Sequence, residues 1–268
     1  MLLKKIIASF LILTLTGLII FLFPNWVFLM LTMAFIALAT KEFFFLVERK
    51  GIFVYRYFGI VAACLIPVSV YINVGRNNID LEPLYIVIAC MFAFILHFVK
   101  RKNAKDTVIS IAVTLLALFY IGWMFSFFVK LKFLPGGSCL VAYLVLVTKM
   151  GDVAAYFGGR ILGKHKLIPR ISPNKTVEGT VCGLTGSVVM AVLAGGLVKL
   201  SPFLLVVLGV FLGVLAQAGD LAESLIKRDC GVKDAGSHIS GFGGVFDIID
   251  SLLFTAPIFY FFMVILLR

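Results

Sequence analysis

The sequence predicts an all-α polytopic membrane protein with about nine transmembrane helices, and two observations support that fold class. The first is composition: of 268 residues, 62% are hydrophobic and only 14% are charged, and the mean hydropathy is +1.13. Soluble globular domains of ordinary composition do not have this balance. The second is that the apolar residues form runs close to the ~20 residues with which a helix crosses a bilayer.

Nine apolar runs are the expected membrane spans, in chain order 6–23, 26–40, 53–74, 84–99, 107–129, 138–157, 177–198, 203–225 and 248–267. The second run is short and follows the tight junction "FPNW" at 23–26, so the first two runs are expected to form a helical hairpin, and a count of eight spans stays open. Lys4 and Lys5 precede the first run as in a signal peptide, but no small-x-small cleavage site followed by a soluble domain is present. The first run is therefore expected to remain as a helix.

The basic residues predict the orientation. With nine spans, seventeen of the 24 Lys and Arg residues fall on the side of the N-terminus and five fall on the other side. Cytoplasmic loops carry an excess of Lys and Arg, so the N-terminus, the loop 158–176 and the stretch 219–251 are expected on the cytoplasmic face. The net charge of +11 is then a topology signal that favours anionic lipid headgroups and requires no nucleic-acid partner.

We expect a single membrane domain, 1–268, with N-terminal packing helices in 1–137 and catalytic helices and loops in 138–268. No linker, low-complexity tract or internal repeat divides the chain. The five cysteines form no CxxC pair and are expected to be reduced, structural thiols. The chemistry-bearing motifs all lie in the C-terminal half, which predicts a polar pocket at the cytoplasmic side of its helices.

The first motif is "TKMGDVAAYFGGRILGKHK", residues 148–166. Lys149 and Asp152 are spaced i, i+3 and lie on one helix turn near the end of a span. They either neutralise each other at the helix end or line a polar cavity, because ionisable groups at membrane depth usually face one.

The second motif is "ISPNKTVEGTVCG", residues 171–183. Ser172 followed by Pro173 has the pattern of an N-cap with proline at the first helical position, so a helix is expected to begin here. Its free amides, with Lys175 beside them, would form a phosphate site. A plain capped helix is the alternative.

The third motif, residues 219–251, holds an unusual share of the charged residues of the chain. Asp220, Ser224 and Lys227 share one helical face at i, i+4 and i+7, and Glu223 can pair with Lys227 at i, i+4. A loop with several glycines follows, and glycine allows the backbone to approach a ligand closely. The next span begins near Asp247 and Asp250, whose carboxylates would be stabilised by the helix dipole.

Acids and bases gathered in one pocket suit a metal–polyphosphate ligand. Carboxylate oxygens bind Mg²⁺, and the metal together with Lys and Arg neutralises a polyphosphate. The alternative is a solvated cluster in which the charges pair only with each other.

The motif "SLIKRDCGVKDAG" followed by "GFGGVFDIIDS" resembles the signature of the phosphatidate cytidylyltransferases, or CDP-diacylglycerol synthases. That signature runs from Ser through Lys-Arg and Lys-Asp to a Pro-Gly-His-Gly-Gly turn and Asp-Arg-x-Asp-Ser. The two upstream motifs are also similar to blocks of this family. The residues that match the signature are Ser224, Lys227, Arg228, Lys233, Asp234, Gly241, Gly243, Gly244, Asp247, Asp250 and Ser251.

The resemblance implies a nucleotidyltransferase of phospholipid biosynthesis in the cell membrane, with its active site facing the cytoplasm. CTP and phosphatidate would give CDP-diacylglycerol and pyrophosphate, with Mg²⁺ required; a second metal ion and a homodimer stay open. Asp220 and Asp247 would bind the metal and, with Lys227, Arg228 and Lys233, form the catalytic set. The residues expected to bind or orient substrate are Ser172, Lys175, Ser224, Asp152, Glu223, Asp234, Asp250, Gly243 and Gly244.

Three positions depart from the family pattern. The His of the glycine turn is Phe242 here, the Pro before that turn is Ser240, and the Arg after the first acid is Ile248. Since the acids and the basic residues remain, an active but divergent enzyme is favoured over an inert scaffold. Two different functions stay open, those of a CTP-dependent lipid-alcohol kinase and of a membrane transporter.

Overall fold

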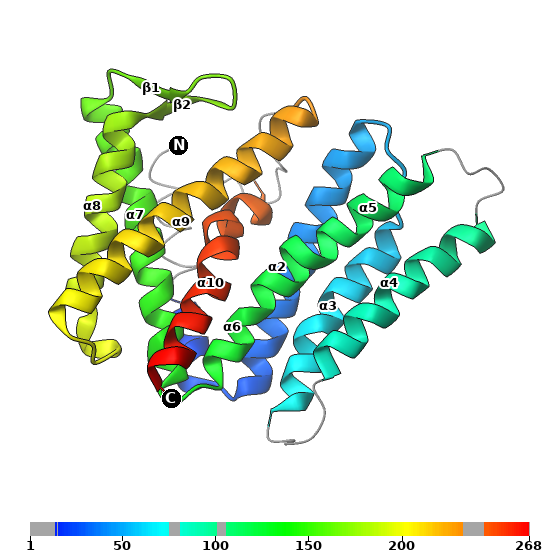
Figure 1. The fold of residues 1–268 in the computed structure, drawn as a ribbon, viewed down its shortest axis with the longest axis horizontal. Coiled ribbons are helices and arrows are strands. Elements are labelled where there is room, and N and C mark those ends of the chain that lie inside the picture. Colours follow the sequence, from blue (N-terminus) through cyan, green and yellow to red (C-terminus); the bar gives the residue numbers. More distant parts are fainter. Residues whose placement is uncertain (1–13, 15, 75–80, 101–105, 233–243, 268) are drawn as a thin grey trace.

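The computed structural model describes residues 14, 16–74, 81–100, 106–232 and 244–267, and this part of the chain is almost entirely helical (Figure 1). Seven of its helical segments are long and apolar enough to cross a membrane. They are α2 (Asn25–Arg49), α3 (Arg56–Asn73), α4 (Leu81–Lys100), the continuous segment Thr107–Lys132, α7 (Gly137–Leu162), α9 (Pro202–Asp229) and α10 (Val245–Leu267). The polytopic membrane fold is therefore confirmed.

The two remaining expected spans are not among these seven. Residues 6–13 of the first run lie outside the described residues. The seventh run forms α8 (Val177–Leu193), an apolar helix of 17 residues, followed by the short turn η2 (Gly195–Leu197). The count of nine spans stays a prediction.

The helices form two groups with α10 between them (Figure 1). On one side lie α7, α8 and α9; on the other lie α2, α3, α4 and the segment Thr107–Lys132. That segment consists of α5 (Thr107–Ala117), the π-helical turn η1 (Leu118–Trp123) and α6 (Met124–Lys132). Helix α10 contacts α9 and α7 in one group and α2 and α6 in the other, so it packs against both halves of the chain.

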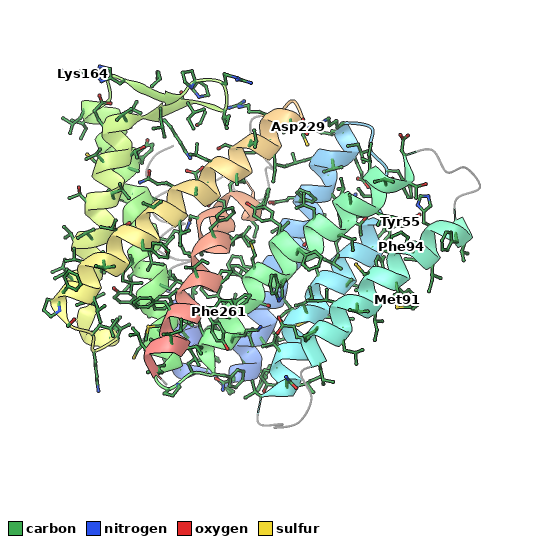
Figure 2. The ribbon with its side chains drawn as sticks, in the orientation of Figure 1. Tyr55, Met91, Phe94, Lys164, Asp229 and Phe261 are labelled. Carbon is green, nitrogen blue, oxygen red and sulfur yellow. The ribbon has the colours of Figure 1, made fainter. Side chains whose placement is uncertain are left out.

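The outer surface of the bundle is apolar, as lipid contact requires. Met91 and Phe94 on α4 are 59% and 47% exposed and point away from the bundle (Figure 2). Inside, one continuous apolar core joins both groups, and the ring of Phe246 on α10 packs against Phe43 of α2 and Tyr120 of η1 at 6.1 and 6.0 Å. Tyr120 lies in the π-helical turn η1, and such turns within α-helices are often found near functional sites.

A β-hairpin connects α7 to α8, and it corrects one sequence expectation. Strands β1 (Lys166–Ile168) and β2 (Ser172–Thr176) pair antiparallel, so Ser172 is not an N-cap and no helix begins at Pro173. A residue before proline is biased toward extended conformations, which suits a strand equally well. Helix α8 begins at Val177, four residues later than expected, and its N-cap is Thr176, whose hydroxyl accepts from the amide of Gly179 at 3.1 Å.

Candidate functional site

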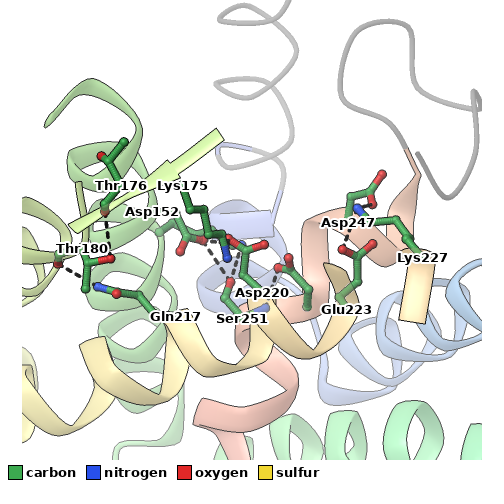
Figure 3. A network of polar contacts seen from close by, with 12 residues as sticks. Asp152, Lys175, Thr176, Thr180, Gln217, Asp220, Glu223, Lys227, Asp247 and Ser251 are labelled. Carbon is green, nitrogen blue, oxygen red and sulfur yellow. Dashed lines mark hydrogen bonds and ion pairs between the residues drawn. The ribbon is translucent and has the colours of Figure 1, made fainter. Parts of the chain in front are cut away.

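Charged side chains from α7, α9, α10 and β2 meet at the end of the bundle that carries the hairpin (Figure 3). Lys164 beside the hairpin and Asp229 at the end of α9 mark this end of the molecule in Figure 2. The connections α7–α8 and α9–α10 both leave from it. These connections belong to two segments that are predicted from the sequence to be cytoplasmic.

Within the described residues, one group of three acidic side chains is arranged closely enough to hold a metal ion. The carboxylate oxygens of Asp220, Glu223 and Asp250 lie within 4.8 Å of one another. Asp220 and Glu223 are one turn apart on α9, whereas Asp250 comes from α10. Glu223 is 1% exposed, and its Oε1 has no hydrogen-bond partner in the part of the chain that the structure describes.

Close contact between α9 and α10 brings these acids together. Gly219 is buried on α9, and a Cβ atom there would lie 2.5 Å from the backbone oxygen of Asp250 and 3.2 Å from the Cα of Ser251. Small residues allow membrane helices to approach this closely. Glycine at 219 therefore sets the spacing between the helices that carry Asp220 and Asp250.

Lys227 joins the acid group to the start of α10. Its Nζ lies 2.6 Å from Glu223 Oε2 and donates to Asp247 Oδ1 at 2.8 Å. The other oxygen of Asp247 accepts from the amide of Gly244 at 2.6 Å. The expected Glu223–Lys227 pair is confirmed, and Asp247 contacts Lys227 and its own helix start.

Lys149 and Asp152 on α7 also form the predicted ion pair, at 3.0 Å. The structure adds Ser251 of α10, whose Oγ accepts from Lys149 Nζ at 2.8 Å and donates to Asp152 Oδ2 at 2.9 Å. The pair is therefore part of a bridge between α7 and α10 and does more than neutralise a helix end.

The hairpin places basic residues over the acids. Lys175 of β2 forms an ion pair with Asp220 at 2.8 Å, a contact between residues 45 positions apart. Arg228 near the end of α9 donates from Nε to the backbone oxygen of Ile171 at 3.0 Å, which fastens the hairpin turn to α9. Glu178 accepts from the backbone amides of Lys164 and His165 and so fixes the other end of the hairpin.

A cavity of about 420 Å³ lies beneath the hairpin, between α7, α8 and α9. Asp152, Lys175 and Asp220 form its charged wall, and Gln217, whose Nε2 donates to the backbone oxygen of Thr180 at 3.0 Å, lies deeper on α9. Arg160 adds a further positive charge to the lining, and the other lining residues are Ala155, Tyr156, Gly159, Leu167, Asn174, Thr176, Gly179, Thr180 and Leu221.

The polar network formed by these side chains carries an imbalance of formal charge. Its positive groups are Lys149, Lys175 and Lys227, and its negative groups outnumber them by two. An excess of two negative charges in a half-buried site matches one divalent cation. The carboxylates of the network are those of Asp152, Asp220, Glu223, Asp247 and Asp250.

Some predicted site residues are not part of this network. Ser172 and Ser224 are half-buried on β2 and α9. Lys233, Asp234 and Gly243 lie outside the described residues, as does Phe242. Sequence reasoning missed Glu42 on α2, whose carboxylate reaches the start of α10. A signal was present, because Glu42 lies two residues beyond the expected span 26–40 and is followed by the apolar stretch 43–47, and an acid at membrane depth usually has a function.

Comparison with known proteins gives consistent matches. Residues 3–266 match the model described as the cytidylyltransferase family. A Bacillus subtilis protein named phosphatidate cytidylyltransferase is 39% identical over 176 residues, which are 64% of this chain and 65% of that protein. A Synechocystis protein of the same name is 30% identical over 272 residues, covering 91% of this chain and 90% of the relative. An Escherichia coli protein, YnbB, described as uncharacterized, is 34% identical over 204 residues, covering 72% of this chain and 67% of the relative.

Proposed function

Because the chain belongs to the cytidylyltransferase family, we propose that it transfers the cytidylyl group of CTP to phosphatidate, giving CDP-diacylglycerol and pyrophosphate. The observation that carries this proposal is the polar network with two excess negative charges beside a cavity of about 420 Å³. Relatives named phosphatidate cytidylyltransferase support the choice of lipid substrate.

We assign the Mg²⁺ site to Asp220, Glu223 and Asp250. Their close oxygens and the unpaired Oε1 of Glu223 form a donor set of the kind that Mg²⁺ prefers. When bound there, Mg²⁺ would neutralise phosphate oxygens of CTP. Asp247 remains a second candidate ligand, since its contacts with Lys227 and the Gly244 amide also suit a residue that orients the lysine.

The basic residues of the site would bind and align the phosphates. The phosphate of phosphatidate attacks the α-phosphorus of CTP in line, the bond to the β-phosphate oxygen breaks, and pyrophosphate leaves. Such a reaction needs alignment and charge neutralisation more than a covalent protein group. Lys175, in the cavity wall, and Lys227, between two carboxylates, would contact phosphate oxygens, and Lys149 would be held by Asp152 and Ser251.

We also propose that this end of the bundle faces the cytoplasm, where CTP is available. The connection between α7 and α8 carries Lys164, Lys166, Arg170 and Lys175 at this end, and α9 ends here with Lys227 and Arg228 in its last turn. The excess of basic residues in loops on one side of a membrane is typical of the cytoplasmic side.

One assay tests the reaction. Purified protein in detergent is supplied with labelled CTP and phosphatidate, with and without Mg²⁺. A CDP-lipid and pyrophosphate that form only with Mg²⁺ are expected. CDP and a newly phosphorylated lipid alcohol would instead indicate a kinase, and the absence of any product would refute the proposed activity.

A second assay tests the ligand assignment. Asp220→Asn and Asp250→Asn should raise the half-saturating Mg²⁺ concentration by at least about tenfold to a hundredfold, because even partners outside the ligand set cost that much. Asp229→Asn is the matched control, since this exposed acid on α9 pairs with Lys50 away from the acid group. If Asp247→Asn changes the Mg²⁺ requirement and Asp250→Asn does not, the ligand set is the one predicted from sequence.

A further inference from the structure

The start of α10 is capped by a residue from the opposite half of the chain. The first amides of a helix have no partners within the helix, and an N-cap side chain usually accepts from one of them. Gly244 precedes the first helical residue, Val245, and has no side chain. Glu42 of α2 fills this role: its Oε2 accepts from the amide of Phe246 at 2.8 Å, across a sequence separation of 204 positions.

Glu42 and Gly244 fit each other sterically. A Cβ atom on residue 244 would overlap Glu42 Oε2 and lie 2.9 Å from Oε1. Glycine therefore leaves the space that the carboxylate occupies. Glu42 is only 2% exposed, and among the described residues its Oε1 has no hydrogen-bond partner, so the contact with the Phe246 amide is the hydrogen bond that the described structure gives this carboxylate.

The helix start that Glu42 caps also fixes Asp247. The amide of Gly244 donates to Asp247 Oδ2, while Lys227 holds Oδ1. The ring of Phe246 packs against Phe43, the neighbour of Glu42 on α2. Two contacts from α2 thus hold the first turn of α10, and Asp250 follows one turn later.

We propose that Glu42 is a positioning residue for the acids of α10, acting through the Phe246 amide. The proposal rests on the proposed function only in that Asp247 and Asp250 take part in catalysis. Without the carboxylate, a buried amide loses its acceptor and the first turn of α10 moves. A displacement of about 1 Å in a catalytic group costs on the order of a hundredfold in rate.

The variants separate the acceptor role from general stability. Glu42→Ala removes the acceptor, and kcat should fall about tenfold to a hundredfold. Glu42→Gln keeps an oxygen acceptor and should restore kcat to within a few-fold of wild type. Glu82→Ala is the control, because Glu82 is also buried and bonded to Trp123 and Lys130, but lies at the opposite end of the bundle.

A second test compares the kcat of the single and double variants at residues 42 and 244. It does not depend on the folding of one variant alone. Gly244→Ala should lower kcat as much as Glu42→Ala does, since the added methyl group displaces the carboxylate of Glu42. In the Glu42→Ala background the same methyl group meets no carboxylate, so adding Gly244→Ala should lower kcat little further. Such non-additivity is expected for residues that are in contact or share a network, whereas distant, independent sites are additive.

The Mg²⁺-induced rise in Tm, measured without substrate, gives a readout besides activity. Glu42→Ala and Gly244→Ala should reduce this rise, and Glu82→Ala should lower the Tm but leave the rise unchanged. The positioning role is wrong if Glu42→Ala keeps the wild-type kcat and the full Mg²⁺-induced rise in Tm. It is also wrong if kcat falls as far in Glu42→Gln as in Glu42→Ala. A wild-type protein that binds Mg²⁺ but makes no CDP-lipid would instead refute the proposed function.

Discussion

Replacing Gly219 with alanine should separate the two helices that carry the acid group. The added Cβ would lie 2.5 Å from the backbone oxygen of Asp250, and ordinary contact begins near 3.4 Å. Neither atom can rotate away, because the position of a Cβ is fixed by the backbone of α9 and the oxygen belongs to the backbone of α10. Helices α9 and α10 must therefore move apart by roughly 0.9 Å, the difference between these two distances.

The shift acts directly beside the acids, so a large catalytic effect is expected. Asp220 follows Gly219 on α9, and the clashing oxygen belongs to Asp250 itself. A displacement of about 1 Å in catalytic groups costs on the order of a hundredfold in kcat. Overpacking also costs about 1–3 kcal/mol of stability, offset by the ~1 kcal/mol better helix propensity of alanine.

Gly209→Ala is the matched control on the same helix. Its Cβ would lie 2.7 Å from the Cα of Val188 on α8, a comparable backbone clash about 15 Å along α9 from Gly219. The propensity gain is the same, so both variants should have similar Tm values in detergent. CDP-diacylglycerol formation should fall about a hundredfold only in Gly219→Ala. Equal turnover in the two variants would refute the claim that Gly219 sets the geometry of the site.

Three further predictions concern topology, charge and the departures from the family pattern. In a thiol-free background, cysteines at the exposed positions Lys166 and Gly196 should be labelled from opposite sides of the membrane, and labelling from one side would overturn the orientation. Lys227→Met leaves two carboxylates without their shared cation and should abolish measurable activity and lower the Tm, because breaking a buried pair costs about 3–5 kcal/mol. Phe242→His and Ile248→Arg should each change kcat/KM by less than roughly tenfold, or ~1.4 kcal/mol; restoration of an inactive wild type by these changes would show that the lost donors were essential.

The sequence predicts the contacts that helical spacing determines. Lys149 with Asp152, and Glu223 with Lys227, are neighbours on any helix at i, i+3 and i, i+4, and both pairs are present. The apolar runs likewise predict the seven long helices, because length and composition are what a membrane span requires.

Contacts between distant segments are not determined by such local rules. The Ser-Pro pattern at 172–173 is compatible with a helix cap and with a strand, and pairing with β1 decides for the strand. The ion pair of Lys175 with Asp220 depends on that hairpin. The same Ser-Pro pattern at 201–202 does cap a helix, α9, where Ser201 accepts from the Leu204 amide.

The arrangement of charges explains how a membrane bundle can keep so many ionisable groups near its interior. Isolated charges in such a place are costly, and association of helices in lipid depends on close packing more than on the hydrophobic effect. At Gly219 the packing of α9 on α10 is tight enough for acids from both helices to share one site, and Lys227 partly neutralises them. Five carboxylates against three lysines leave this network with an excess of formal negative charge, which agrees with the cation that we propose for the site. The N-terminal half contributes through Glu42, because the first amides of α10 have no acceptor within the helix and Glu42 supplies one to the amide of Phe246.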